Sequence, residues 1–205
     1  MMNKEKVINL IGWLLLLLWV ISTITQFVIK QPTTIFWFCN LAIFVLAIAC
    51  FQRSVFLTYA ILAPAFIFQL PWTIDWIISK TTNLIFLNLK EFYQGTSQII
   101  MFIITLRHIT IIPVSIFLLF LLKPKKPSRK QIVLSILAVL ILFLVSYIQP
   151  ISHNINCIHR SCIPFLPVYN IVYTLIWIIS SILISLIFLF LISKIHKKFN
   201  NKINK

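Results

Sequence analysis

Apolar residues fill long stretches of this chain, and polar residues fall in short groups between them. Six stretches are long and apolar enough to be membrane-spanning helices. We expect them at residues 8–29, 34–51, 54–78, 98–122, 132–149 and 168–193. The pattern therefore predicts an all-α polytopic membrane protein, a six-transmembrane-helix bundle that forms a single membrane domain over residues 1–205.

The segments between the predicted helices refine this picture. The turn from Phe51 to Ser54 is very short, so the second and third helices should form a hairpin. Residues 80–97 are too polar to span a membrane, and we expect them to lie along its outer surface as an interfacial helix. The first helix has no small-residue cleavage site behind it, which favours a retained helix over a signal peptide.

Composition supports the membrane class. The 205 residues are 60% hydrophobic and only 10% charged, which is far from the average of soluble domains. The formal net charge of +15 raises the question of nucleic-acid binding. The basic residues lie in loops and in the tail, without the interleaved aromatic residues of a nucleic-acid-binding domain. We therefore predict no nucleic-acid partner. Topology, together with the Ile-, Lys-, Asn- and Phe-rich composition that an AT-rich genome gives, is the expected reason for the basic residues, and contact with anionic lipid headgroups is the alternative. Membrane lipids are the expected partner.

The basic residues also predict the orientation of the bundle. In a six-span arrangement, thirteen lie on the side of the termini: Lys4, Lys6, Arg53, Lys123, Lys125, Lys126, Arg129, Lys130, Lys194, Lys197, Lys198, Lys202 and Lys205. Four lie on the opposite side: Lys30, Lys80, Lys90 and Arg160. The positive-inside rule then places both termini in the cytoplasm of a multi-pass cell-membrane protein.

A few polar residues fall inside the predicted helices, where they normally face the interior of the bundle. They are Cys39, Asn40, Gln69, Asp75, Arg107 and His108. Gln98, Met101, Thr105 and His108 follow at helical spacing, so they should share one face. Most of these groups lie in the outer half, which predicts a cavity open to the outer side. The alternative is structural: they hold helices together, for example through an Asp75–Arg107 ion pair.

The predicted outer loop at residues 153–162 (HNINCIHRSC) holds an unusual group of side chains, namely His153, Cys157, His159 and Cys162. A disulfide between Cys157 and Cys162 would close a short loop on the oxidising side. The same four side chains are types that bind zinc, although their spacing is not that of a standard zinc site. A third possibility is that they are free and line the entrance of the cavity, together with Asn154.

The segment from Phe36 to Ser54 (FWFCNLAIFVLAIACFQRS) resembles the second helix of the YwaF-like proteins, relatives of the vertebrate transmembrane protein 164. In that family a Cys near the start of this helix is followed by a small or amide residue and an aliphatic run. A proline-containing third helix, a His in the fourth, a basic hairpin and an Asn-bearing loop also fit. The resemblance covers residues 32–191 in outline and is specific around Cys39 and His108.

This resemblance implies lipid acyl chemistry. The vertebrate relatives are phospholipid acyltransferases that use a Cys and a His, and a more distant six-pass group of androgen-induced lipid hydrolases uses a Thr with a His. By correspondence, Cys39 would be the nucleophile and His108 its general base. A lysolipid or water would then attack the acyl-cysteine. The chain departs from the family at Phe36, Trp37 and Phe38, where the family usually has a His before the Cys.

The sequence therefore leads to three functional hypotheses, none of which requires a cofactor. The first is a Cys39–His108 lipid acyltransferase or hydrolase, with Asn40, Asp75, Gln98, Thr105, His153 and Asn154 as candidate binding residues. The second is a small-molecule binding or transport subunit with an outer-facing cavity lined by Trp72, Asp75, Trp76 and Tyr169. The third is a non-enzymatic accessory subunit, in which the buried polar groups only join helices.

Overall fold

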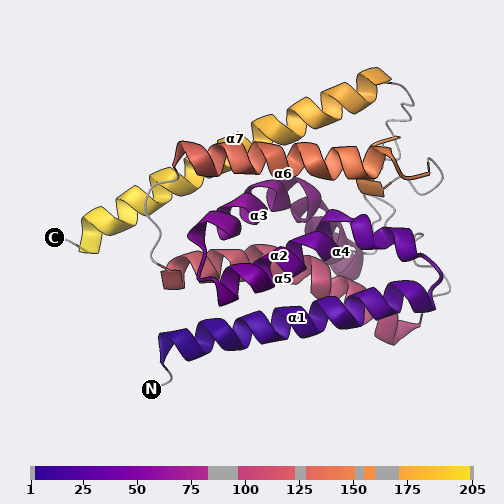
Figure 1. The fold of residues 1–205 in the computed structure, drawn as a ribbon, viewed down its shortest axis with the longest axis horizontal. Coiled ribbons are helices and arrows are strands. Elements are labelled where there is room, and N and C mark those ends of the chain that lie inside the picture. The colour runs from indigo at the N-terminus through magenta and orange to yellow at the C-terminus, as the bar shows by residue number, and fades with distance from the viewer. Residues whose placement is uncertain (1–2, 83–96, 123–127, 151–154, 160–170, 204–205) are drawn as a thin grey trace.

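The computed structural model describes residues 3–82, 97–122, 128–150, 155–159 and 171–203, and these residues contain helices and no strand (Figure 1). The all-α prediction is confirmed. The α-helices are α1 (Lys4–Val28), α2 (Phe38–Phe51), α3 (Val55–Phe68), α4 (Leu70–Thr82), α5 (Gln98–Leu122), α6 (Arg129–Tyr147) and α7 (Ile171–Ile203). Two short 3₁₀ helices, η1 (Pro32–Phe36) and η4 (Ile155–Cys157), lie between them.

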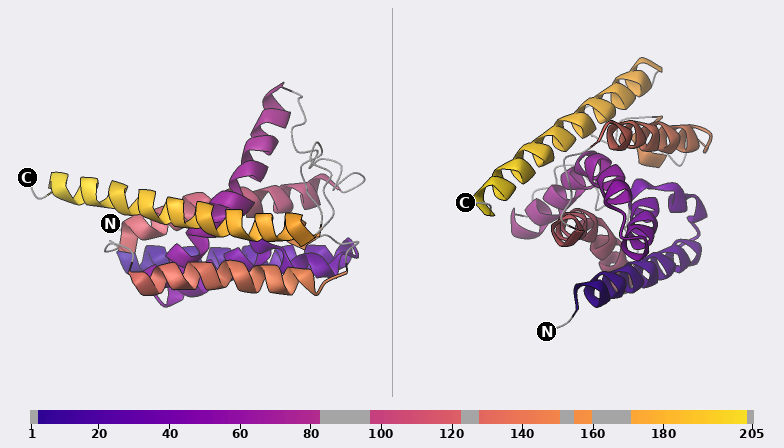
Figure 2. Two further views of the ribbon diagram at one scale, coloured as in Figure 1. Left: turned by 90° about the horizontal axis from the view of Figure 1, so that it is seen from above. Right: turned by 60° about the vertical axis from the view of Figure 1, so that its left-hand side comes forward.

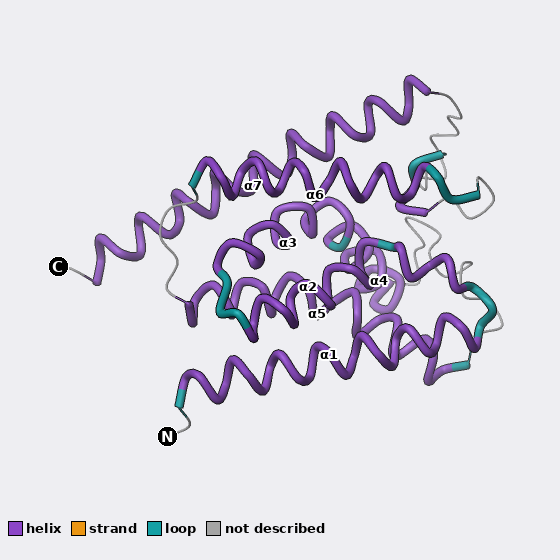
Figure 3. Tube along the Cα trace, viewed as in Figure 1, coloured by secondary structure: helices purple, strands orange, loops and turns teal. Residues whose placement is uncertain are grey.

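Helix α3 occupies the middle of the bundle. It contacts α2 and α5 on one side and α6 and α7 on the other, while α1 packs against α2 and α5. The two described chain ends lie at the same end of the bundle, together with the turn between α2 and α3 (Figures 1 and 3). An ion pair of 3.1 Å between Arg53 and Glu5 joins that turn to the start of α1. The connection from α1 to α2 lies at the opposite end (Figure 3).

Four of the described helices are long and apolar enough to cross a membrane: α1, α5, α6 and residues 171–191 of α7. A fifth crossing results if α3 and α4 count as one broken span. The outer surface of these helices is strongly apolar, with Trp13 63% and Phe120 79% exposed, while most of the buried polar residues face inward. This distribution is the reverse of that in a soluble protein, and it agrees with a membrane-embedded bundle.

The third predicted helix is wrong in one respect, because the structure breaks it. Helix α3 ends at Phe68, and α4 runs from Leu70 at an angle of 45° to it. The cause is Pro71, which has no N–H for the ladder and disfavours helical geometry at the residue before it. Figure 2 shows α4 pointing away from the bundle. The predicted interfacial helix at residues 80–97 lies mostly outside the described residues.

The second predicted helix starts later than expected. Residues 32–36 form η1, Trp37 is extended (φ −63°, ψ 141°), and the α-helix begins only at Phe38. Pro32 at the start of η1 is compatible with a helical first turn because its N–H is not needed there. The remaining boundaries lie within four residues of those expected, except that α7 continues to Ile203, ten residues past the predicted end at 193; α5 covers residues 98–122 as predicted.

Helices α1 and α2 pack closely at Gly12. A Cβ atom added there would lie 2.9 Å from Cε1 of Phe51 and 3.0 Å from Cβ of Cys50. The facing side of α2 carries small buried residues, among them Ala42, Ala49 and Cys50. Small residues let helix backbones approach in membranes, where dispersion contacts replace the hydrophobic effect as the force between helices. This close contact brings the polar residues of α1 and α2 together farther along the same interface.

Candidate functional site: a buried arginine centre

Three helices meet at a buried polar triangle. Nη1 of Arg107 on α5 donates to the hydroxyl oxygen of Ser22 on α1, at 3.0 Å, and to Oδ1 of Asn40 on α2, at 2.9 Å. The Ser22 hydroxyl in turn donates to the same Asn40 oxygen, at 3.2 Å. All three residues are at most 2% exposed. We call these three residues the arginine centre.

The arginine centre is fixed by a second set of hydrogen bonds at the start of α2. Nδ2 of Asn40 donates to the backbone oxygen of Thr34 in η1, at 2.8 Å. The Thr34 hydroxyl donates to Oε1 of Gln26, which is buried on α1. Asn40 therefore uses its amide oxygen for Arg107 and its amide nitrogen for η1. This division orients the side chain, since the two ends of an amide are not interchangeable here.

Ser22 differs from three other buried serines of the bundle in where its hydroxyl hydrogen is donated. Ser115, Ser135 and Ser146 each donate to the backbone oxygen four residues earlier in their own helix. That arrangement satisfies the hydroxyl hydrogen within the serine's own helix. The Ser22 hydroxyl bonds across helices instead, so its role is to hold the guanidinium.

In the described part of the chain no carboxylate pairs with the charge of Arg107. Among the described residues, Nη1 is the guanidinium nitrogen that has hydrogen-bond partners, and both partners are uncharged. Nε is buried and has no hydrogen-bond partner among the described residues. An arginine at the centre of a membrane helix costs about 2.5–3.5 kcal/mol on insertion scales, and buried charges are normally paired. The edge of the guanidinium formed by Nε and Nη2 can therefore donate hydrogen bonds to another group.

His108 follows Arg107 and faces α4. Its ring stacks on Trp72, with 4.0 Å between the ring centroids and 17° between the planes. Nδ1 of His108 lies 2.7 Å from the backbone oxygen of Ile104. Asp75, one turn after Trp72, is also buried. The stacking of His108 on Trp72 therefore connects α4, just after its break from α3, to α5, the helix that carries Arg107.

Cys39 lies next to Asn40 in the second position of α2. It is free and 1% exposed, and it directly precedes Asn40, which accepts from Arg107. In the described part of the chain no hydrogen bond joins Cys39 to His108, whose Nδ1 is engaged with its own helix. The structure therefore brings Cys39 close to the arginine centre but does not show the nucleophile–base contact that the resemblance implies.

The other candidate residues are spread over the bundle. Thr105 is buried on α5, one turn before His108, whereas Gln98 is exposed at the start of that helix. His153, Asn154 and Cys162 lie outside the described residues. Cys157 is disulfide-bonded, while Cys39 and Cys50 are free. The described residues contain no group of three or more His, Cys, Asp or Glu side chains that could hold a metal ion.

The structure adds two functional residues that the sequence analysis did not single out. Ser22 lies in a helix whose residues are otherwise largely apolar, and the neighbouring pair Ser22 and Thr23 was the available signal. Asn156 lies in the loop after α6, between two groups of candidate ligands, and its side chain reaches the start of α2. Neither pairing follows from spacing along the chain, because the partners come from distant elements.

Comparison with known proteins gives no relative for this arrangement. No protein-family model matches the chain, no curated protein matches it, and no solved structure matches its fold.

Proposed function

We propose that this chain is a multi-pass cell-membrane protein that binds the anionic group of a membrane amphiphile at the arginine centre. The observation that carries the proposal is the guanidinium of Arg107, which is 2% exposed and bonded to uncharged partners alone among the described residues. A ligand with a negative charge would supply the missing counter-charge. Its hydrocarbon part would suit the apolar surroundings.

The hydrogen-bond pattern narrows the ligand class. Ser22 and Asn40 both bind Nη1, which leaves the edge formed by Nε and Nη2. Two parallel N–H groups on one edge match two oxygens of a carboxylate or of a phosphodiester. One cationic residue also balances one negative charge. The proposed ligand is therefore a singly charged amphiphile, either a fatty-acid carboxylate or a phospholipid phosphodiester.

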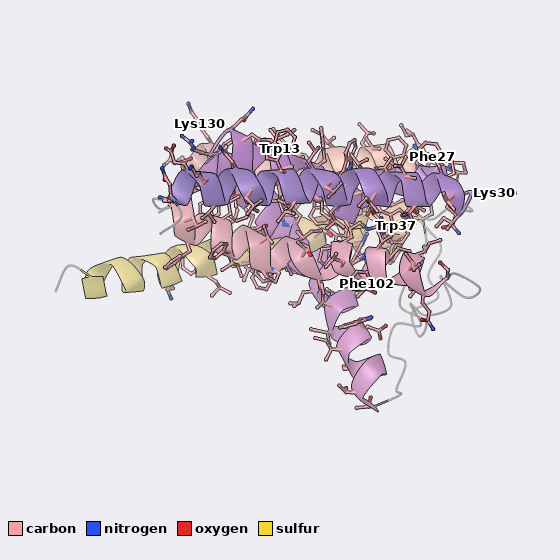
Figure 4. All side chains as sticks on the ribbon, turned by 90° about the horizontal axis from the view of Figure 1, so that it is seen from below. Trp13, Phe27, Lys30, Trp37, Phe102 and Lys130 are labelled. Carbon is pink, nitrogen blue, oxygen red and sulfur yellow. The ribbon has the colours of Figure 1, made fainter. Side chains whose placement is uncertain are left out.

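The membrane placement that we propose has six crossings and both termini in the cytoplasm. Helix α2 rises about 21 Å over its length, which is too short for a hydrocarbon core of about 30 Å. The preceding η1 adds about 10 Å at its steeper rise, and the two together match the core. Figure 4 shows Lys130 and Lys30 at opposite ends of the bundle. The end that carries Lys130 also carries both described chain ends, so the positive-inside rule favours the cytoplasm for it.

Acyl chemistry at Cys39 is a second candidate function. The observation in its favour is that the free thiol of Cys39 adjoins Asn40, which accepts from Arg107. A ligand held by Arg107 would place its polar end near this thiol. A lipophilic thioester probe would then acylate Cys39 in preference to Cys50, which is equally free and buried on the same helix. Equal or absent labelling of the two thiols would exclude this activity.

The binding proposal is tested with protein purified in an uncharged detergent. We expect native mass spectrometry to detect a bound anionic lipid on the wild type and on Arg53→Gln, whose arginine is exposed and paired with Glu5. Arg107→Gln should lose this lipid, and Arg107→Lys should retain little of it, because an ammonium group lacks the two-pronged edge.

Two further titrations distinguish a fatty-acid carboxylate from a phospholipid phosphodiester as the bound anion. Delipidated wild type is titrated with oleate or with phosphatidylglycerol, and its thermal midpoint is followed. A rise in the thermal midpoint with one of the two amphiphiles identifies the head group that binds. Arg107→Gln should weaken the binding of that amphiphile at least about 10-fold, which corresponds to about 1.4 kcal/mol. The proposal is wrong if neither amphiphile raises the midpoint, or if Arg107→Gln responds like the wild type.

A further inference from the structure

The side chain of Asn156 makes three hydrogen bonds that join separate parts of the bundle. Oδ1 accepts the backbone N–H of Phe38 at 2.9 Å. Nδ2 donates to the hydroxyl of Ser146 on α6 at 2.8 Å and to the backbone oxygen of Phe36 in η1 at 3.2 Å. Asn156 is 3% exposed, so these bonds form away from solvent.

The bond to Phe38 replaces a missing helix cap. The first N–H groups of a helix have no partner within the helix, and the side chain of the preceding residue normally accepts one of them. The residue before α2 is Trp37, whose side chain gives no such bond. Asn156 supplies the acceptor from 118 residues away in the chain. The start of α2 therefore depends on the outer loop.

The outer turn that presents Asn156 is itself held under strain. Asn156 (φ 52°) and Cys157 (φ 59°) both have positive φ angles, which non-glycine residues rarely adopt, although asparagine tolerates them best. Helix α7 holds the turn in place: Trp177 donates to the oxygen of Asn156 at 3.2 Å, and Tyr173 donates to that of Cys157 at 2.9 Å. A third bond, from Thr174 to the oxygen of Ile158 at 2.9 Å, reaches the loop one residue after the two with positive φ and is not needed to fix them. Strained turns persist when surrounding contacts determine them in this way.

The capped end of α2 carries the acceptor of the arginine centre. Cys39 and Asn40 directly follow Phe38, and Asn40 also binds η1, the segment that Asn156 holds through Phe36. A displacement of Phe38 would thus move the oxygen that accepts from Arg107. Among the described residues no hydrogen bond joins Asn156 to Arg107, so the effect of Asn156 must pass through α2.

We infer that Asn156 is the positioning residue of the arginine centre: it caps α2 from the outer loop and so sets the place of Cys39 and Asn40. This inference rests on the proposed function only for its effect on ligand affinity. Its effect on the start of α2 is independent of any ligand.

The test uses three variants of the full chain. Asn156→Gly keeps the positive φ angle accessible and removes the side chain. Asn156→Asp retains an acceptor for Phe38 and loses the two bonds that Nδ2 donates. Thr174→Val is the matched control, since it removes one buried hydrogen bond of the same loop without touching α2.

The first readout is the alkylation rate of Cys39 by N-ethylmaleimide, with Cys50 in the same molecule as the internal standard. Loss of a helix cap should raise the rate at Cys39 about 10-fold in Asn156→Gly and leave Cys50 unchanged. Asn156→Asp should give a smaller rise, and Thr174→Val should match the wild type. The second readout is the affinity for the amphiphile. It should fall most in Asn156→Gly, less in Asn156→Asp, and not at all in Thr174→Val.

The two readouts separate the two hypotheses. A rise at Cys39 with no amphiphile binding by the wild type would disprove the proposed function and support the positioning role. Wild-type alkylation in Asn156→Gly, or an equal rise in Thr174→Val, would overturn the positioning role. If Asn156→Gly does not fold, Asn156→Asp decides through the two bonds that Nδ2 donates to Phe36 and Ser146: a rise at Cys39 supports the positioning role, and a wild-type rate overturns it.

Discussion

Nη1 of Arg107 and Oδ1 of Asn40 lie 2.9 Å apart, although the two residues are separated by 67 positions in the chain. The contact joins an arginine inside a long apolar helix to an uncharged amide. A carboxamide satisfies a guanidinium as an acceptor but does not neutralise it. This difference between hydrogen-bond satisfaction and charge neutralisation is the basis of the binding proposal, and it can be changed by a single isosteric substitution.

Asn40→Asp places a carboxylate where the structure has an amide. The new charge would pair with Arg107, as charge-assisted hydrogen bonds are shorter and stronger than neutral ones. We expect affinity for the anionic amphiphile to fall at least about 10-fold while the thermal midpoint of ligand-free protein does not fall. Titration of both proteins, with the midpoint as readout, checks this.

Asn40→Ala is the control for that substitution. It removes the acceptor of Arg107 and the donor to Thr34 without adding a charge. It should therefore lower stability by about 1–3 kcal/mol in the absence of ligand. Unchanged amphiphile affinity in Asn40→Asp would contradict the role of Arg107 as an unpaired cation.

Gly12→Ala should destabilise the contact between α1 and α2. The added methyl group would meet the Phe51 ring and Cβ of Cys50 at distances shorter than ordinary contacts. Overpacking of this kind costs about 1–3 kcal/mol. We expect a lower thermal midpoint in detergent, and Leu10→Ala, at an exposed position of the same helix, should change it little. An unaltered midpoint in Gly12→Ala would mean that the two helices are less closely packed than described.

Thiol counting tests the pairing in the outer loop. Cys39 and Cys50 are free, Cys157 is disulfide-bonded, and the predicted partner Cys162 lies outside the described residues. Alkylation of the unreduced, denatured protein should therefore modify two cysteines, and mass spectrometry should locate them at Cys39 and Cys50. Modification of all four would refute the disulfide. After reduction with a phosphine, four modified cysteines are expected.

Reporter fusions test the orientation. Alkaline phosphatase is active outside the cytoplasm, whereas green fluorescent protein folds to its fluorescent form inside it. If the basic end of the bundle faces the cytoplasm, phosphatase fused after Lys205 should be inactive. Green fluorescent protein fused at the same position should be fluorescent. Insertion of phosphatase after His159 should give activity, because the adjoining η4 lies at the end of the bundle opposite the chain ends (Figure 1). Phosphatase activity at the tail would reverse the proposed orientation.

Apolar periodicity was sufficient to predict an all-helical membrane protein and the approximate ends of most helices. It was not sufficient for the third predicted helix. Pro64 and Pro71 both lie in that apolar run, yet α3 continues through Pro64 and the chain breaks before Pro71. Which proline interrupts a helix depends on whether neighbouring groups satisfy the freed backbone, and this is a property of packing rather than of local sequence.

The polar residues of the candidate site were recognised one by one, but their partners were not. Helical spacing correctly placed Thr105 and His108 on a buried face of α5. It did not show that Arg107 reaches α1 and α2, nor that Asn156 caps α2. Contacts between helices depend on crossing angles and on the register of close packing, such as the approach at Gly12, and one sequence contains little information about either.

The buried guanidinium also bears on ion permeation. A fixed positive charge in the middle of a low-dielectric bundle repels any approaching sodium or potassium ion. At a separation of 4 Å the repulsion is about 4 kcal/mol for an effective dielectric constant of 20. The interior around Arg107 is therefore a barrier to cations and an attractive well for anions, as in pores that select by the sign of a lining charge.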